Sequence, residues 1–337
     1  FVISSLLVMV VGIGSGMVAY YVGFPAGAFS SPGGPEELQY IPHDAALIAY
    51  ADVRHIMTSE LRQRIRRAIP AEENGQQEFE RRTGINIEAD IDHVVAAFES
   101  GAAGGPGPGS ALVLARGTFN EVTIEALMRE HGAQVGQYKG KRLIEAAVEK
   151  PVAPNTPRPE NAPKPQDLTV AFLKPGLVAL GSSLLVRRAI DLENGGDSAV
   201  NNEEVMTLVR SLDSGDAWAV GRFDMLRAAA KLPQGIGELP PITWFSATGT
   251  VNDGINAVLS AEAGTDEAAK NLRDVIQGFV ALANLQAGSK PELKAVVQSL
   301  ELSGTGKRVA LRFSVPGRVL DLMTPAALPK PESQPAQ

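Results

Sequence analysis

The segment DAALIAYADV, residues 44–53, decides the fold, because it reads as a buried strand and recurs in altered form later in the chain. It is a short apolar run rich in alanine, leucine and isoleucine, which is typical of a strand. A related segment, DAWAVGRFDML, begins at Asp216 with the same Asp-Ala pair and reaches Asp224 eight residues on, as Asp44 reaches Asp52. The correspondence predicts two copies of one unit, and chance similarity of strand openings is the alternative.

Further strands follow from the same pattern. Apolar runs at 93–100 and 111–119 resemble the first one, and hairpins are predicted to turn at Pro175-Gly176, at Asp253-Gly254 and between Gly304 and Gly306. The last hairpin has one buried face, because apolar and polar residues alternate along it; its apolar members are Leu300, Leu302, Val309, Leu311 and Phe313.

Helices are predicted between these strands. Asn120 can cap a helix that stops at Gly132, Thr265 can cap a longer one, and Ser59 precedes a third. Two more are expected at 186–192 and 203–212. The longer helix carries apolar residues at helical spacing, namely Leu272, Val275, Ile276, Phe279 and Ala283. The fold class is therefore α+β, with two repeated units of antiparallel sheet covered by helices, at 38–200 and 201–325.

The first 24 residues, FVISSLLVMVVGIGSGMVAYYVGF, carry no charge, and the first charged residue is Glu36. As a helix they would extend about 36 Å, enough to cross a hydrocarbon core of roughly 30 Å. We expect a single transmembrane helix at 1–24, with Tyr20 and Tyr21 at the membrane interface. A cleaved signal peptide is the alternative, because Ala26 to Ala28 supply small residues suited to cleavage.

Two glycines in this span, Gly12 and Gly16, have the small-xxx-small spacing that lets helices pack closely in lipid. We expect them to contact transmembrane helices of other subunits, although glycine is also simply common in membrane helices. Downstream, Glu36 and Glu37 precede the first basic residue, Arg54, which places the body outside the cytoplasm. The expected location is the bacterial inner membrane, single-pass, with most of the chain on the periplasmic side.

The composition of the chain limits the kinds of partner that it can bind. The chain has 337 residues, a net charge of −7 and no cysteine, which describes a mildly acidic globular body. Nucleic acid is an unsuitable partner because no excess positive charge exists to bind phosphate. Proline- and glycine-rich segments mark linkers or loops at 25–37, 101–110 and 150–166, and a proline-rich tail at 326–337.

The segments YIPHDAALIAYADVRHIMTSEL (40–61) and GDAWAVGRFDML (215–226) carry a resemblance. They resemble a loose class of uncharacterised bacterial proteins with one N-terminal membrane anchor and a duplicated extracytoplasmic α/β body. The resemblance implies no activity and no catalytic residues. Proteins of this shape are also similar in type to accessory subunits of bacterial respiratory or photosynthetic complexes.

Groups suited to chemistry are few. His43 with Asp44, His55 with Asp52, and His93 with Asp92 each bring an imidazole near a carboxylate, but none has metal-ligand spacing, and His131 stands alone. No nucleophile motif occurs, and the lysines of GQYKGKR and GTGKR are expected in solvated hairpin turns. No catalytic, cofactor or metal residue is predicted, and no small-molecule substrate is identified. Trp218 and Trp244 are expected in the core or on a sheet face.

An arginine-rich helix is the strongest charged feature. Its members are Arg62, Arg64, Arg66 and Arg67, and they are candidate contacts for lipid headgroups or an acidic partner. The alternative is a helix docked on its own sheet, with Glu72, Glu73, Glu78 and Glu80 balancing the charge.

Two functions follow as hypotheses. The first is a non-catalytic accessory or scaffolding subunit of an inner-membrane complex. The second is an anchored protein that binds a lipid, peptide or envelope component between its two halves. An anchored hydrolase is a third, for which the sequence assembles no residues.

Overall fold

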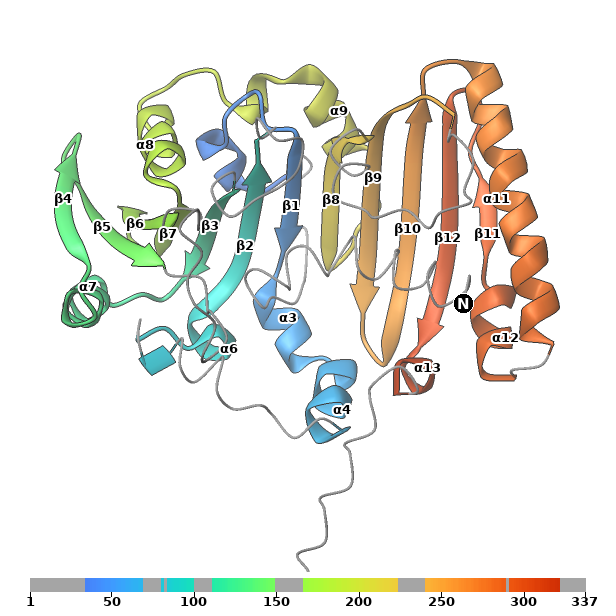
Figure 1. Ribbon diagram of the computed structural model, residues 1–337, viewed down its shortest axis with the longest axis horizontal. Helices are drawn as coiled ribbons and strands as arrows, with labels where there is room; N and C mark the ends of the chain where they lie inside the picture. The colour runs from blue at the N-terminus through green and yellow to red at the C-terminus, as the bar shows by residue number, and fades with distance from the viewer. Residues whose placement is uncertain are drawn as a thin grey trace, which may run out of the picture.

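The computed structural model describes residues 34–68, 80–81, 84–99, 111–148, 166–223, 240–288 and 291–321. Every strand among them belongs to one antiparallel sheet of 12 strands, with helices on both faces (Figure 1). The predicted α+β class, with antiparallel strands and covering helices, is confirmed. The predicted membrane span at 1–24, with Gly12, Gly16, Tyr20 and Tyr21, lies outside the described residues; within them, no helix has the length and apolar character to cross a membrane.

The first half of the chain supplies seven strands. Its elements are η2 (Glu36–Tyr40), β1 (Leu47–Ala51), α3 (Val53–Thr58), α4 (Glu60–Ala68), α6 (Ile87–Asp90), β2 (Ile91–Phe98), β3 (Ala111–Gly117), α7 (Glu121–Glu130), β4 (Gln134–Tyr138), β5 (Lys141–Val148), β6 (Gln166–Lys174), β7 (Leu177–Gly181), α8 (Ser183–Leu192) and η4 (Ala199–Asn201).

The second half supplies five strands. Its elements are α9 (Glu203–Arg210), β8 (Ala217–Arg222), β9 (Ile242–Val251), β10 (Gly254–Ala263), α11 (Asp266–Ala287), α12 (Pro291–Gln298), β11 (Glu301–Ser303), β12 (Arg308–Pro316) and α13 (Gly317–Asp321).

The two halves meet in the middle of the sheet and follow the same strand order outward. From the centre the first half runs β1-β2-β3-β7-β6-β5-β4, and the second runs β8-β9-β10-β12-β11. In each half the last strand returns beside the third, and a helix follows both the third strand (α7, α11) and the last (α8, α13). The β4–β5 hairpin has no counterpart among the described residues of the second half.

The central contact is the antiparallel pairing of β1 with β8, which puts Ile48 opposite Val220 and Tyr50 opposite Trp218. Ile48 lies four residues after Asp44, and Val220 lies four residues after Asp216. The strand openings that look alike in the sequence are therefore placed symmetrically about this pair. The sheet is continuous across the boundary between the halves.

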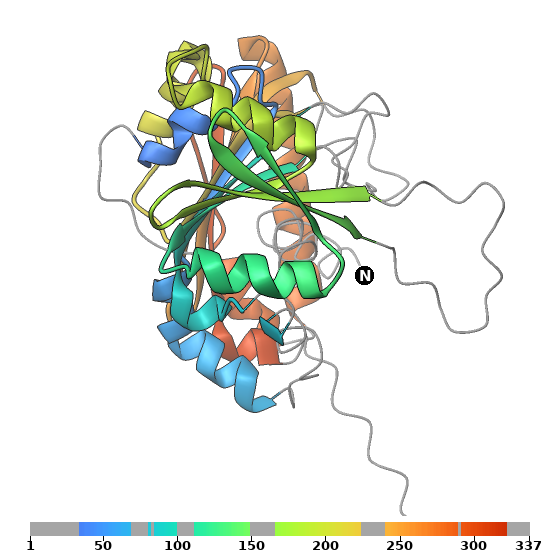
Figure 2. The same cartoon turned by 90° about the vertical axis from the view of Figure 1, so that its left-hand side faces the viewer.

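Hydrophobic clusters cover both faces of the sheet. On one face Ile48, Tyr50, Trp218 and Val220 pack with η2, α8 and α9, and on the other Ala49, Val94 and Phe98 pack with α3, α6 and α7. Seen from the β4 end, α8 and α7 lie on opposite sides of the strands (Figure 2). Residues from both halves contribute to these two clusters, so the halves share a core at the centre of the sheet. Among the described residues, three smaller clusters consist of residues of the second half alone. Trp218 is 2% exposed, which confirms its predicted place in the core, and half-buried Trp244 packs against the first cluster.

Sequence signals for turns and helix starts are confirmed at most of the predicted positions. Asn120 caps α7 by accepting a hydrogen bond from Thr123 N–H (3.1 Å), and Thr265 caps α11 by accepting one from Ala268 N–H (3.1 Å). The hairpin β6–β7 turns at Pro175-Gly176, where Gly176 has φ 75°. The hairpin β9–β10 turns one residue earlier than predicted, because Gly254 already belongs to β10.

Some boundaries were wrong. β1 begins at Leu47 and not at Asp44, and α3 begins at Val53, within the run predicted as strand, because Asp52 caps that helix. The turn in GQYKGKR joins β4 to β5 as predicted, but Lys141 is not simply solvated. Its ammonium lies 2.8 Å from a carboxylate oxygen of Glu193.

The central pair gives a first prediction. Ile48 is 1% exposed at the point where the halves meet, so Ile48→Ala removes buried methyl groups and leaves a cavity. We expect the free energy of unfolding to fall by about 2–5 kcal/mol in urea denaturation. Val122→Ala is the control, because Val122 is 80% exposed and its change is expected within about 0.5 kcal/mol. Equal losses in the two variants would contradict a central role for this pair.

Candidate functional site: a histidine–aspartate pair and a buried glutamate

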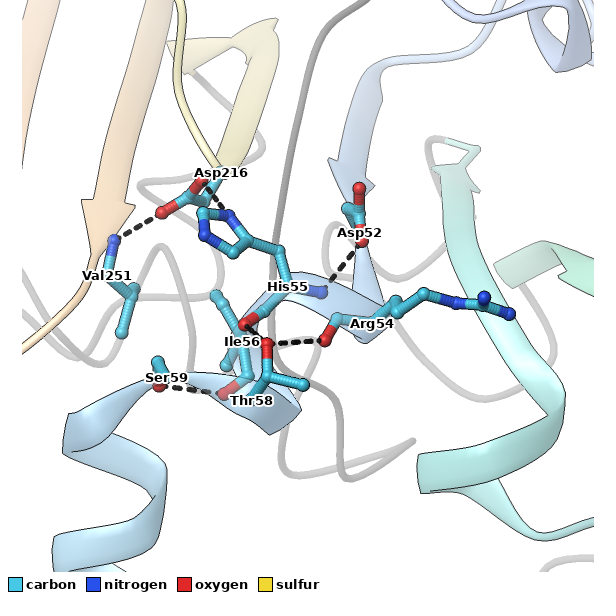
Figure 3. Close-up of polar contacts among 8 residues, drawn as sticks. All are labelled: Asp52, Arg54, His55, Ile56, Thr58, Ser59, Asp216 and Val251. Atoms are coloured by element: carbon cyan, nitrogen blue, oxygen red, sulfur yellow. Dashed lines mark hydrogen bonds and ion pairs between the residues drawn. The ribbon is translucent and has the colours of Figure 1, made fainter.

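An imidazole and a carboxylate meet where β1 ends and β8 begins. His55 lies in α3, directly after β1, and its Nδ1 is 2.8 Å from Oδ1 of Asp216, the residue before β8. The other carboxylate oxygen of Asp216 accepts a hydrogen bond from Val251 N–H at 2.6 Å (Figure 3). Asp216 thereby joins α3 to β9.

The expected pairing of His55 with Asp52 was wrong for the side chain. Asp52 accepts a hydrogen bond from the backbone N–H of His55 at 3.0 Å and so caps α3. Because the cap occupies that carboxylate, the imidazole is left to Asp216, which lies far away in the sequence.

The His55–Asp216 pair resembles the base and orienting carboxylate of a hydrolase. The His55 side chain is 57% exposed and that of Asp216 only 9%, so the imidazole faces solvent on one side and a buried acceptor on the other. The neighbouring hydroxyl groups do not complete such a site. Thr58 Oγ1 donates to the carbonyl of His55 and Ser59 Oγ to that of Ile56, both at 2.7 Å. The contacts that surround the pair are those of a helix end.

A second charged cluster surrounds Glu37, in η2 just before the body begins. Glu37 is 1% exposed. Arg116 Nε donates to its Oε1 at 2.8 Å, and His93 Nε2 lies 3.3 Å from its Oε2. His93 and Arg116 are cross-strand partners on β2 and β3. One carboxylate therefore fixes η2 to two adjacent strands.

Burial raises the pKa of Glu37, but the close contact with the His93 imidazole and the hydrogen bond from Arg116 outweigh it and lower the pKa to about 2. Beside it, Lys174 donates to Glu36 at 2.7 Å and lowers the pKa of that carboxyl. Burial raises the pKa of Tyr50, whose ring lies 5.5 Å from the His93 ring and is stacked on Trp218. His93 was expected to lie near Asp92, but its imidazole is paired with Glu37.

The remaining histidines also contact groups within the fold. His43 Nδ1 lies 3.9 Å from Asp197, whereas Asp44 bonds to Arg188 at 2.7 Å. His131 Nδ1 lies 2.8 Å from the carbonyl of Leu127, one turn earlier in α7. Among the described residues, no three histidine or carboxylate side chains gather closely enough to hold a metal ion.

The arginine-rich helix is α4, and it is docked on the fold at its first turn. Leu61 is buried, and Arg62 donates to Glu88 at 2.9 Å. Arg64 lies beside Gly317, since a Cβ at that glycine would be 2.8 Å from the Arg64 Nη1. The side chains of Arg66 and Arg67 lie outside the described residues, so a lipid or partner contact there stays a prediction. Among the described residues, Arg62 is paired with Glu88; Glu72, Glu73 and Glu78 lie outside the described residues, so the expected charge balance stays a prediction.

An open hollow of about 370 Å³, lined by both polar and apolar residues, lies on the second half of the sheet. Asp213 and Arg312, 3.4 Å apart, are at its margin, and Thr248, Asn256 and Ser314 line it. It contains none of the histidines. It also does not lie between the halves, where β1 and β8 are paired.

Sequence reasoning missed Glu37 and Asp216 as partners of histidines. A signal was present for Asp216. If the two related strand openings lie side by side and antiparallel, the start of one falls beside the end of the other, and Asp216 must approach Asp52 and His55. No comparable signal pointed to Glu37, because its partners come from two strands distant in the sequence.

No protein-family model matches the chain, and no curated protein matches it. Among solved structures, the fold is similar to the one titled "Structure of crystal form I of TP0453", with 12% sequence identity and a TM-score of 0.47, over 86% of this chain and 96% of that chain. A likeness of this degree carries no argument about function.

The Glu37 cluster gives a pH prediction. The pKa of Glu37 falls from 4.5 to about 2 on folding, so its ionised form stabilises the fold above about pH 4.5, and this contribution is lost as the pH falls toward 2. The difference corresponds to about 3 kcal/mol. Between pH 5 and 3, the free energy of unfolding of the wild type should decline more steeply than that of Glu37→Gln, as measured by urea denaturation. Parallel slopes would contradict the buried pairing.

The Asp216 contact gives a stability prediction. Asp216→Ala leaves the Val251 N–H without its acceptor, so we expect a loss of about 1–3 kcal/mol. His55→Ala should cost less, within about 1 kcal/mol, because that side chain is more than half exposed. Both losses in the free energy of unfolding are measured by urea denaturation at neutral pH. A larger loss for His55→Ala would mean that the imidazole, and not the hydrogen bond from Val251 N–H to Asp216, holds the junction.

Proposed function

We propose that this chain is a non-catalytic accessory or scaffolding subunit of a bacterial inner-membrane protein complex. One helix at 1–24 anchors it, and the body stands on the periplasmic side. The observation that carries the proposal is the β1–β8 pairing, which joins both halves into one sheet. A body built on one continuous sheet can hold a partner protein at a fixed position relative to the membrane anchor, which is what a scaffolding subunit requires.

The Glu37 cluster supports this role. It lies at the start of the body, and it fixes η2 to β2 and β3 through Glu37, His93 and Arg116. Breaking a buried pair of this kind by removing one partner typically costs several kcal/mol. The cluster therefore holds η2, the first described element of the body, firmly on the sheet.

We infer further that the two halves descend from one repeated unit. The shared strand order and the symmetric placement of Ile48 and Val220 support this. When a unit is duplicated and the first strands of the two copies pair with each other, one larger sheet forms. No other contact surface is needed to join the copies.

The alternative, an anchored protein that binds a ligand between its two halves, is less well supported. A ligand site between the halves would need space that the paired backbones of β1 and β8 and the Tyr50–Trp218 stack occupy. What favours it is the hollow beside Asp213 and Arg312, whose polar margin suits a small hydroxylated or charged ligand.

The experiment is gentle solubilisation of native membranes, isolation of the full chain at native abundance, and mass identification of what migrates with it. We expect stable companions in fixed stoichiometry, and in a respiratory or photosynthetic complex any pigment or redox cofactor would belong to them. A chain that migrates without protein companions would overturn the proposal. A small molecule that co-purifies with it, absent from an Arg312→Ala variant, would instead support the binding protein.

A further inference from the structure

The C-terminal part of α11 has an unusual composition for a surface helix. The stretch VIQGFVALANLQAG, from Val275 to Gly288, carries no charge, whereas the first turns hold Asp266, Glu267, Lys270, Arg273 and Asp274. A surface helix normally places charged residues on its outer side. The helix stands at one end of the molecule, beside the short edge strand β11 (Figure 1).

One side of α11 accounts for only part of this apolar character. Leu272 and Ala269 are buried against β10 and β12, and Ala283 and Ala287 against α12. This inward side was predicted to include Val275. The structure places Val275 on the outer side, 37% exposed, and Phe279 at the boundary, half-buried.

A second apolar row faces solvent, and we call it the α11 row. It consists of Val275, Gly278, Ala281, Leu282 and Leu285, which at 100° per residue span an arc of about 120°. Leu282 is 50% exposed and Leu285 is 78% exposed. Three of the six exposed large apolar side chains among the described residues are in this row. The exposed apolar surface is therefore concentrated on α11, which is typical of an interaction site.

We propose that the α11 row packs against the same row of a second copy of this chain, with the two helices antiparallel across a two-fold axis. An uncharged row is self-complementary, because no like charges meet when it faces itself. At Gly278 no atom lies within 4 Å of where a Cβ would be, so a leucine of the other helix has space to approach the backbone. The antiparallel arrangement also opposes the two helix dipoles.

The distribution of charge favours a second copy over a lipid surface. Helices that lie on membranes carry Lys or Arg on the polar face that borders their apolar face, where these residues meet anionic headgroups. The stretch from Val275 to Gly288 has no basic residue on any side. In an antiparallel pair centred near Ala281, the charged first turns of each helix extend beyond the contact and remain in water. The end position of α11 leaves room for two bodies to approach.

The absence of cysteine from the chain gives a clean test. A single thiol is placed in the full-length, detergent-solubilised protein by Ala281→Cys or Leu282→Cys, near the axis, or by Gln277→Cys, an exposed position on another side of the same helix. A disulfide forms only when the two Cα atoms come within about 7 Å. After mild oxidation we expect disulfide-linked dimer from at least one axial position, at least about tenfold above Gln277→Cys. Equal yields from all three would indicate random collision and overturn the proposal.

Light scattering on the same preparation provides the second measurement. The wild type should have the mass of a dimer, and the double variant Leu282→Asp with Leu285→Asp that of a monomer, with unchanged circular dichroism because both side chains are exposed. A monomeric wild type, or a double variant that stays dimeric, would overturn the α11 pairing. If the wild type is monomeric yet binds other subunits, and the double variant does not, the row serves a foreign partner, and the proposed accessory function stands while the dimer fails.

Discussion

The pairing of β1 with β8 is the contact on which the rest of the structure depends. Without it the chain would form two separate sheets, each with an open edge in the middle of the molecule. Open edges with unpaired N–H and C=O groups invite pairing with other chains. Here the two edges satisfy one another, and the stacked rings of Tyr50 and Trp218 lie across the join at a centroid distance of 5.8 Å.

Charged groups hold the elements that hydrophobic contacts alone would leave loose. η2 is a single short turn, too short to be stable by itself, yet Glu37 within it is buried. A buried carboxylate is tolerated only when its desolvation is offset by partners, and His93 and Arg116 provide them from two strands. Asp216 acts in the same way for α3. Both carboxylates therefore specify which short helix lies on which strand.

Much of the fold could be predicted from local signals, and the reason is visible in the elements that were found. Asn120 and Thr265 mark helix starts because their side chains accept hydrogen bonds from the first turn, and Gly176 marks a turn because only its backbone adopts that conformation easily. The site could not be predicted in the same way. Asp52 and His55 are neighbours in the sequence, but the cap removed Asp52 from the imidazole, and a pairing over 161 residues depends on the sheet order.

The β11 end of the sheet limits how another protein can contact it. Its edge strand β11 has only three residues and includes Glu301. Such short, charged edge strands resist extension by a further strand. A contact there must use side chains rather than backbone, and α11 beside it is the element that supplies them. Its apolar inner side is needed to cover β10 and β12, but that need does not extend to Leu282 and Leu285. Because exposure of these side chains brings no gain in folding, their presence on the outer side is best explained by a surface that is buried in an assembly.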